Sequence, residues 1–196
     1  LARAGLTLNE LAETRAELLG HLFGITVSRH DAASIDDRLP PGVRPTVVLM
    51  NPPFSAVAHV DRTMKDAVLR HVASALARLA PGGRLIAITA ASCSPDAPAW
   101  RDTFVRLQEQ ARVVFTAAID GKVYAKHGTT IDTRLTVIDK LFAEEQTRFV
   151  ESAGNAPDTA TLLQWVLDRV PPRPPVTSSP VSALPVNASG SPGRAK

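Results

Sequence analysis

The chain has 196 residues, which is enough for one domain of ordinary size, and 44% of them are apolar. Its single cysteine, Cys93, excludes an internal disulfide framework, and no apolar stretch is long enough to predict a membrane-spanning helix. The net charge of +3 is compatible with a polyanionic partner, and without a signal-peptide pattern at the start we expect a cytoplasmic protein.

Short apolar runs alternate with amphipathic segments, which predicts an α/β fold with a mostly parallel sheet. In chain order, the predicted strands are 6–8, 25–27, 47–50, 84–89, 113–118 and 135–141. The predicted helices are 12–22, 66–79, 100–110 and 161–170. The run 47–50 is apolar throughout, which is typical of a strand that is buried on both faces.

Composition divides the chain into three parts. Residues 1–150 carry the alternating pattern of the core, and residues 151–170 hold the terminal helix. Residues 171–196 contain seven prolines and many small residues, with no apolar periodicity. We therefore predict that this last part is a disordered linker rich in proline, serine and alanine.

The tetrapeptide Asn51-Pro52-Pro53-Phe54 directly follows the predicted strand 47–50, where doubly wound folds bind ligands. The Asn51 side-chain oxygen and the Pro52 carbonyl can accept the two hydrogens of a planar amine. The prolines fix that carbonyl in place, and Phe54 offers a ring on which a base can stack. This arrangement suits methyl transfer to an amine nitrogen, whereas a strand-ending turn with a buried phenylalanine is the alternative without chemistry.

Three stretches of the chain carry a family resemblance. They are Val47 to Ser55, Leu79 to Leu85, and Ile119 to Thr129 followed by Asp132 to Asp139. Over about residues 6–142 the chain resembles adenine-N6 amino-methyltransferases, and among them the bacterial methylase modules fused to strawberry-notch-type helicases. The resemblance implies a Rossmann-like class I methyltransferase fold, S-adenosylmethionine as cofactor, a DNA base flipped into the pocket, and an attached helicase region.

The resemblance also implies residues that bind the cofactor, and Asn51 is one of them. Glu10 would bind the ribose hydroxyls, although Asn9 or Glu13 could do so, and Glu10 could instead serve a helix N-terminus. Asp31 would accept from the adenine amine and the backbone of Ala32 would donate to the ring. The alternative for Asp31 is an N-cap for a turn around Ser34-Ile35.

Cationic and aromatic residues after the tetrapeptide are candidates for contact with nucleic acid. Arg62, Lys65 and Arg70 could contact phosphates, or could form a solvated helix face. The resemblance suggests that the loop between the last two predicted strands approaches the target base, and its candidates are Tyr124, Lys126, His127 and Arg134. His127 is not needed as a general base, because the methylated amine can lose its proton to water.

The chain departs from the family before Glu10, where the first strand and its glycine-rich cofactor loop would stand. We therefore expect the fold to be truncated at the N-terminus, and the isolated chain to bind S-adenosylmethionine weakly or not at all. Cys93 lacks the preceding proline of a cytosine-C5 methyltransferase nucleophile, so we interpret it as an ordinary small residue.

Other functions fit the same tetrapeptide. Methyltransferases of guanine N2 in RNA share Asn-Pro-Pro-aromatic chemistry, as do protein glutamine methyltransferases, which usually carry tyrosine in place of Phe54. The alternative from another class of function is a non-catalytic module, which would bind nucleic acid or a partner protein on behalf of an attached helicase. We expect no metal site.

Overall fold

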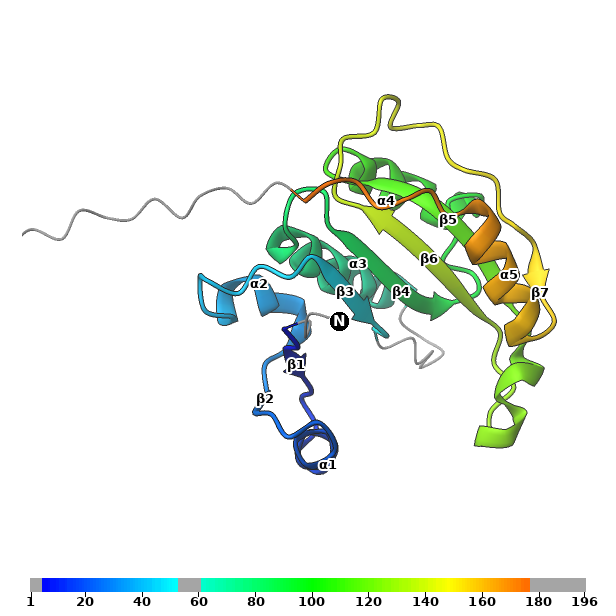
Figure 1. The fold of residues 1–196 in the computed structure, drawn as a ribbon. Coiled ribbons are helices and arrows are strands. Elements are labelled where there is room, and N and C mark those ends of the chain that lie inside the picture. Colours follow the sequence, from blue (N-terminus) through cyan, green and yellow to red (C-terminus); the bar gives the residue numbers. More distant parts are fainter. Residues whose placement is uncertain (1–4, 53–60, 177–196) are drawn as a thin grey trace, which may run out of the picture.

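The computed structural model describes residues 5–52 and 61–176, with only the backbone described for 61–66 (Figure 1). Pro53 and Phe54 of the tetrapeptide lie outside these ranges, and so do residues 177–196 of the expected linker.

The described strands form two sheets (Figure 1). Their bounds are β1 (Leu8–Asn9), β2 (Val27–Ser28), β3 (Val47–Met50), β4 (Arg84–Ala90), β5 (Arg112–Ile119), β6 (Thr133–Asp139) and β7 (Asn155–Ala156). β1 pairs with β2 in parallel, and the larger sheet has the order β3-β4-β6-β5-β7. Only β6 runs against its neighbours in the larger sheet, which confirms the mostly parallel α/β fold.

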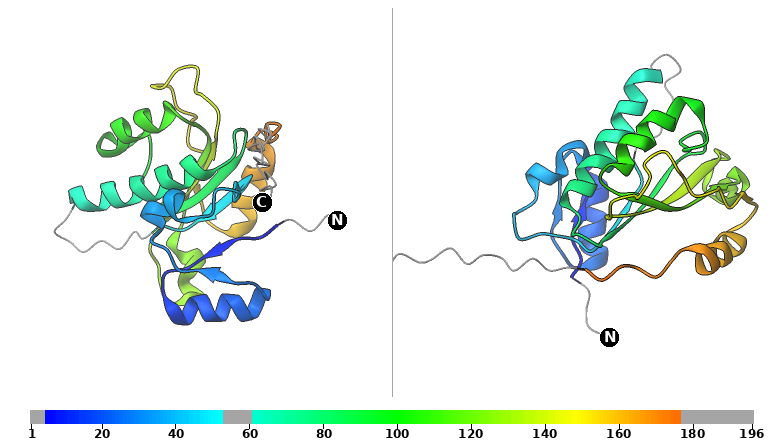
Figure 2. Two further views of the ribbon diagram at one scale, coloured as in Figure 1. Left: turned by 90° about the vertical axis from the view of Figure 1, so that its left-hand side faces the viewer. Right: turned by 90° about the horizontal axis from the view of Figure 1, so that it is seen from above.

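The described helices are α1 (Glu13–Phe23), η1 (Ala32–Ser34), α2 (Ile35–Arg38), α3 (Asp61–Arg78), α4 (Pro98–Gln108), η2 (Gly121–His127) and α5 (Thr159–Arg169). Figure 2 shows α3 and α4 on one side of the larger sheet and α5 on the other. Between helices α3 and α4 and the sheet lies one buried apolar cluster, which contains Leu79, Leu85 and, from α4, Phe104. Under α5, Trp165 packs against a second cluster that contains Phe115.

β3 corrects the expectation that its apolar run is buried on both faces. Val48 and Met50 pack against the cluster under α3, but Val47 is 45% exposed and Leu49 is 76% exposed. The physical reason is that β3 is the edge strand of its sheet, and no described element covers its second face at these two residues.

Residues 171–176, the first six of the expected linker, lie across the amino-terminal ends of β3 and β4. The Arg84 guanidinium donates to the Pro171 carbonyl at 2.9 Å, and Arg173 donates to the Thr46 carbonyl at 3.3 Å. Arg84 also makes a two-pronged ion pair with Asp139 on the neighbouring β6, at 2.7 and 2.9 Å. One arginine thus joins two strands and the segment after α5.

Most predicted elements are present with shifted ends. α3 begins five residues earlier than expected, at Asp61, and the expected loop between β5 and β6 contains the 3-10 helix η2. The short helices η1 and α2 and the two-residue strand β7 were not predicted.

Candidate functional site

The carboxyl-terminal ends of the parallel strands are where doubly wound folds place their ligands. Asn51 follows β3 directly and is exposed, whereas Pro52 is buried. No described residue hydrogen-bonds to the Asn51 side chain, so its amide is available to a ligand. The buried ring of Pro52 holds the backbone that carries it.

Glu10 stands one residue beyond β1, with 22% of its side chain exposed. Its Oε1 accepts from the Ala12 backbone N–H at 2.8 Å and from Arg15 at 2.9 Å. The Arg15 hydrogen bond, helped by the Ala12 N–H, lowers the pKa of this carboxyl. Both hydrogen bonds use Oε1, so Oε2 can accept from another donor, while the Ala12 contact also fits the alternative of a helix-terminal carboxylate.

The two alternatives to Glu10 have partners within the described chain. Asn9 Oδ1 accepts from the Ser28 hydroxyl at 2.9 Å and from the His30 N–H at 3.0 Å, and Asn9 Nδ2 donates to the His30 carbonyl at 3.0 Å. Glu13 is paired with Arg29 at 3.0 Å. Asn9 therefore extends the pairing of β1 and β2 by one rung, whereas Glu10 and Glu13 each keep one carboxylate oxygen without a hydrogen bond to a described residue.

Asp31 follows β2 and caps η1, since its Oδ1 accepts from the Ala33 N–H at 2.9 Å. The same oxygen lies 3.5 Å from His71 Nε2 on α3. The Ala33 hydrogen bond, with His71 and Arg70, lowers the pKa of the carboxyl. No described residue hydrogen-bonds to Oδ2, so the capping role leaves that oxygen available beside Ala32.

η2 lies between β5 and β6 and projects from the sheet at the lower right of Figure 1. Its base is tied down by Gly121, whose N–H donates to Asp132 Oδ1 at 2.7 Å and whose α-carbon lies against the Thr130 carbonyl, where a side chain would collide. The Tyr124 hydroxyl accepts from Thr133 at 3.1 Å, while Lys126 and His127 are exposed. The projection presents a cation and an imidazole to solvent.

Arg134 lies inside the sheet rather than on the projection, and is 9% exposed. Its guanidinium donates to the Ala91 carbonyl and to Thr116 Oγ1 at 3.0 Å, and to Ser152 Oγ at 3.3 Å. Burial lowers its pKa. These bonds join three segments, so its geometry serves the fold.

Of the three cations expected on α3, the structure describes the side chain of Arg70. Arg70 is exposed and close enough to Asp31 to lower the pKa of that carboxyl. Arg62 and Lys65 lie in the first turns of α3, and their side chains are outside the described part of the chain.

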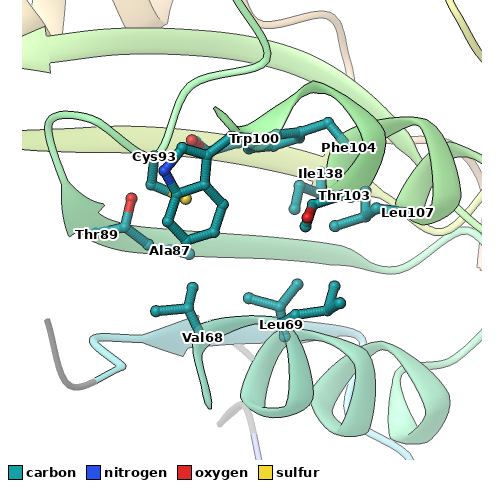
Figure 3. A pocket seen from close by; sticks show the side chains of 12 residues that line it. Val68, Leu69, Ala87, Thr89, Cys93, Trp100, Thr103, Phe104, Leu107 and Ile138 are labelled. Atoms are coloured by element: carbon teal, nitrogen blue, oxygen red, sulfur yellow. The ribbon is translucent and has the colours of Figure 1, made fainter. Parts of the chain in front are cut away.

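Cys93 lines a small apolar cavity between α3, α4 and β4, together with Val68, Ala87 and Trp100 (Figure 3). The cavity volume is about 30 Å³, which leaves space for water but not for a base. Burial raises the pKa of the Cys93 thiol to about 11, so it stays protonated at neutral pH. This agrees with the interpretation of Cys93 as an ordinary small residue.

In the part of the chain that the structure describes, no group of three His, Cys, Asp or Glu side chains could hold a metal ion. None of the described helices is long and apolar enough to cross a membrane.

No protein-family model matches the chain, and no curated protein matches it in sequence. Among solved structures, it is similar to a Listeria monocytogenes protein described as a class I S-adenosylmethionine-dependent methyltransferase, with a TM-score of 0.58, 11% identity, and coverage of 83% of this chain and 55% of that one. It is also similar to a type I restriction enzyme modification subunit from Vibrio vulnificus, with a TM-score of 0.54, 13% identity, and coverage of 83% and 41%. For the M protein of the type I restriction enzyme EcoKI, the TM-score is 0.52 at 15% identity, over 71% of this chain and 32% of that one.

The chain thus spans about a third to a half of the length of these proteins. At these identities the similarity concerns the fold alone. The strand order β3-β4-β6-β5 with β6 reversed, and helices on both faces, accompany it. The chain has the Rossmann-like fold of class I S-adenosylmethionine-dependent methyltransferases.

Proposed function

We propose that the protein is a methyltransferase that uses S-adenosylmethionine to methylate the exocyclic N6 amine of adenine in DNA. The observation that carries the proposal is Asn51, whose exposed side chain lies directly beyond β3 without a described partner while Pro52 is buried behind it. The Asn51 oxygen and the Pro52 carbonyl would accept the two amine hydrogens and orient the nitrogen.

The cofactor would be held by acids at the ends of the two parallel strands of the small sheet. Glu10 Oε2 suits a ribose hydroxyl, and Asp31 Oδ2 suits the adenine amine, since no described residue bonds to either oxygen. When bound, S-adenosylmethionine supplies an activated methyl group on a positively charged sulfur. The residues of this chain bind it and orient the acceptor.

Two features support DNA as the substrate. Lys126 and His127 are exposed on a projection beside the carboxyl-terminal ends of β4 and β5. Two of the similar structures are of type I restriction enzymes, one of them described as a modification subunit. We further propose that a helicase region is attached or associated, which rests on the resemblance at residues 119–139.

The test is to incubate the complete protein with DNA and labelled cofactor and to digest the product to nucleosides. We expect N6-methyladenine, and Asn51→Ala should lower kcat by about 10²–10³-fold. Asn155→Ala, at the exposed residue of β7, is the matched control and should leave kcat unchanged. Formation of methylated guanine in RNA or of methylated glutamine in protein would instead support one of the alternative methyltransferase classes. Full activity of Asn51→Ala would refute the role of Asn51.

A further inference from the structure

In the second half of α3, one face carries three polar side chains: His71, Ser74 and Arg78. All three face the segment that follows β2. Ser74 Oγ donates to Asp36 Oδ1 and accepts from the Asp36 N–H at 3.1 Å. Arg78 donates to the Leu39 carbonyl at 2.9 Å. α3 therefore holds residues 31–39 through side-chain contacts.

His71 makes the contact nearest to the proposed cofactor site. Its side chain is only 12% exposed, and Nε2 lies 3.5 Å from Asp31 Oδ1. Its other ring nitrogen, Nδ1, is buried with no hydrogen-bond partner among the described residues. Among the described residues, Asp31 is thus the one polar partner of this largely buried ring.

Asp31 is held from the other side as well. The preceding residue, His30, exchanges two backbone hydrogen bonds of 3.0 Å with the Asn9 side chain, which fixes the chain just beyond β2. The Ala33 N–H and His71 both approach Oδ1, whereas the Asp31 side chain as a whole is 65% exposed. These contacts turn the carboxylate so that Oδ2 is the oxygen left open.

We propose that His71 is a positioning residue for Asp31, which holds the carboxylate by Oδ1 so that Oδ2 accepts from the exocyclic amine of a bound adenine ring. The inference rests on the proposed function, because it presumes an adenosine-containing ligand at Asp31. An amine donates to a carboxylate, whereas a carbonyl oxygen in the same place would be repelled. His71 therefore contributes to discrimination between adenine and hypoxanthine rings. Arg70, a cation near Asp31, is exposed and adds general attraction.

The experiment compares adenosine with inosine as probes, because they differ in having an amine or a carbonyl at the relevant ring position. Affinities are measured by calorimetry on the complete protein, and the Asp31 carboxyl is titrated by carbon-13 NMR without ligand. The variants are His71→Leu, which removes both ring nitrogens, and His71→Gln, which keeps a donor of similar reach. Ser74→Ala is the matched control, since it lies on the same face but contacts Asp36.

We expect wild-type protein to prefer adenosine by at least about 10-fold. His71→Leu should reduce this preference by about 5-fold or more and raise the pKa of Asp31, with the affinity for inosine unchanged. His71→Gln should restore most of both properties, and Ser74→Ala should alter neither.

An unchanged Asp31 titration and an unchanged preference in His71→Leu and His71→Gln would overturn the positioning role. An equal loss of adenosine preference in Ser74→Ala would also overturn it, because α3 would then only support residues 31–39 in general. If wild-type protein binds neither nucleoside nor S-adenosylmethionine although Asp31 responds to His71, the proposed cofactor site fails and the adenine-directed role fails with it. Binding of S-adenosylmethionine without preference for adenosine over inosine would overturn this inference alone.

Discussion

Arg134 places a guanidinium in the sheet where only 9% of the residue reaches solvent. Replacing it by methionine would keep an unbranched apolar stem but no donor, and would leave Thr116 Oγ1 and the Ala91 carbonyl without their donor. We expect Arg134→Met to lower the free energy of unfolding by about 2–4 kcal/mol, measured by urea denaturation at neutral pH.

Arg106→Met on α4 is the control for Arg134→Met. Arg106 is exposed, and its guanidinium makes one long hydrogen bond of 3.4 Å to the Asp102 carbonyl. Its replacement should change the free energy of unfolding by less than about 0.5 kcal/mol. Equal stability of the Arg134 variant would mean that the buried guanidinium is not needed by the fold.

The sequence was enough to choose the candidate site residues because their position relative to strand ends is local information. Glu10, Asp31 and Asn51 each follow an apolar run within a few residues. The hydrogen bonds of Asn9 and Glu13 could not be predicted, since their partners Ser28, His30 and Arg29 lie 16 to 21 residues away, at and just after β2. His71 was missed for the same reason, because its contact with Asp31 depends on how α3 packs.

At the scale of single elements, sequence patterns located the helices better than their ends. The first turn of α3, from Asp61, is polar and lacks the apolar spacing that marks a core-facing helix, so the prediction started at residue 66. η2 was predicted as a loop because the segment between the two strands is polar and contains glycine. Gly128 caps it with a φ of 80°, in the left-handed region that favours glycine.

η2 carries a prediction about nucleic acid. Lys126 is exposed on it without a described partner, so its ammonium is available to a phosphate. We expect Lys126→Ala to weaken DNA binding similarly for all sequences. It should also reduce the slope of log affinity against log salt by about 1, measured by fluorescence anisotropy over a salt series.

Lys122→Ala on the same short helix is the matched control. Its ammonium lies 3.9 Å from the Asp120 carboxylate, so part of its charge is already compensated. Its replacement should change the salt slope less than Lys126→Ala does. A Lys126 variant with the wild-type slope would contradict the proposed approach of this projection to DNA.

For the whole molecule, the alternation of strands and helices was enough to predict an α/β fold with a mostly parallel sheet, but it carries no information on strand order. β1 and β2 pair with each other in a sheet of their own. Which distant segments pair in this way cannot be derived from local patterns of residues. The error over β3 has the same origin. An apolar run such as Val47–Met50 reads alike whether the strand lies in the middle of a sheet or at its edge.

In the part of the chain that the structure describes, one face of β3 is bare and one edge is unpaired, and both affect how the protein behaves in concentrated solution. An apolar strand with open backbone groups is a template for pairing with a second molecule, so we expect weak, reversible self-association that grows with protein concentration. Leu49→Lys should reduce it in sedimentation velocity runs. Phe142→Lys, at a residue that is 82% exposed but lies outside every described strand, should have a smaller effect. Equal effects of the two variants would assign the attraction to general apolar exposure. A larger effect of Leu49→Lys would mean that the colloidal stability of this chain depends on its first edge strand.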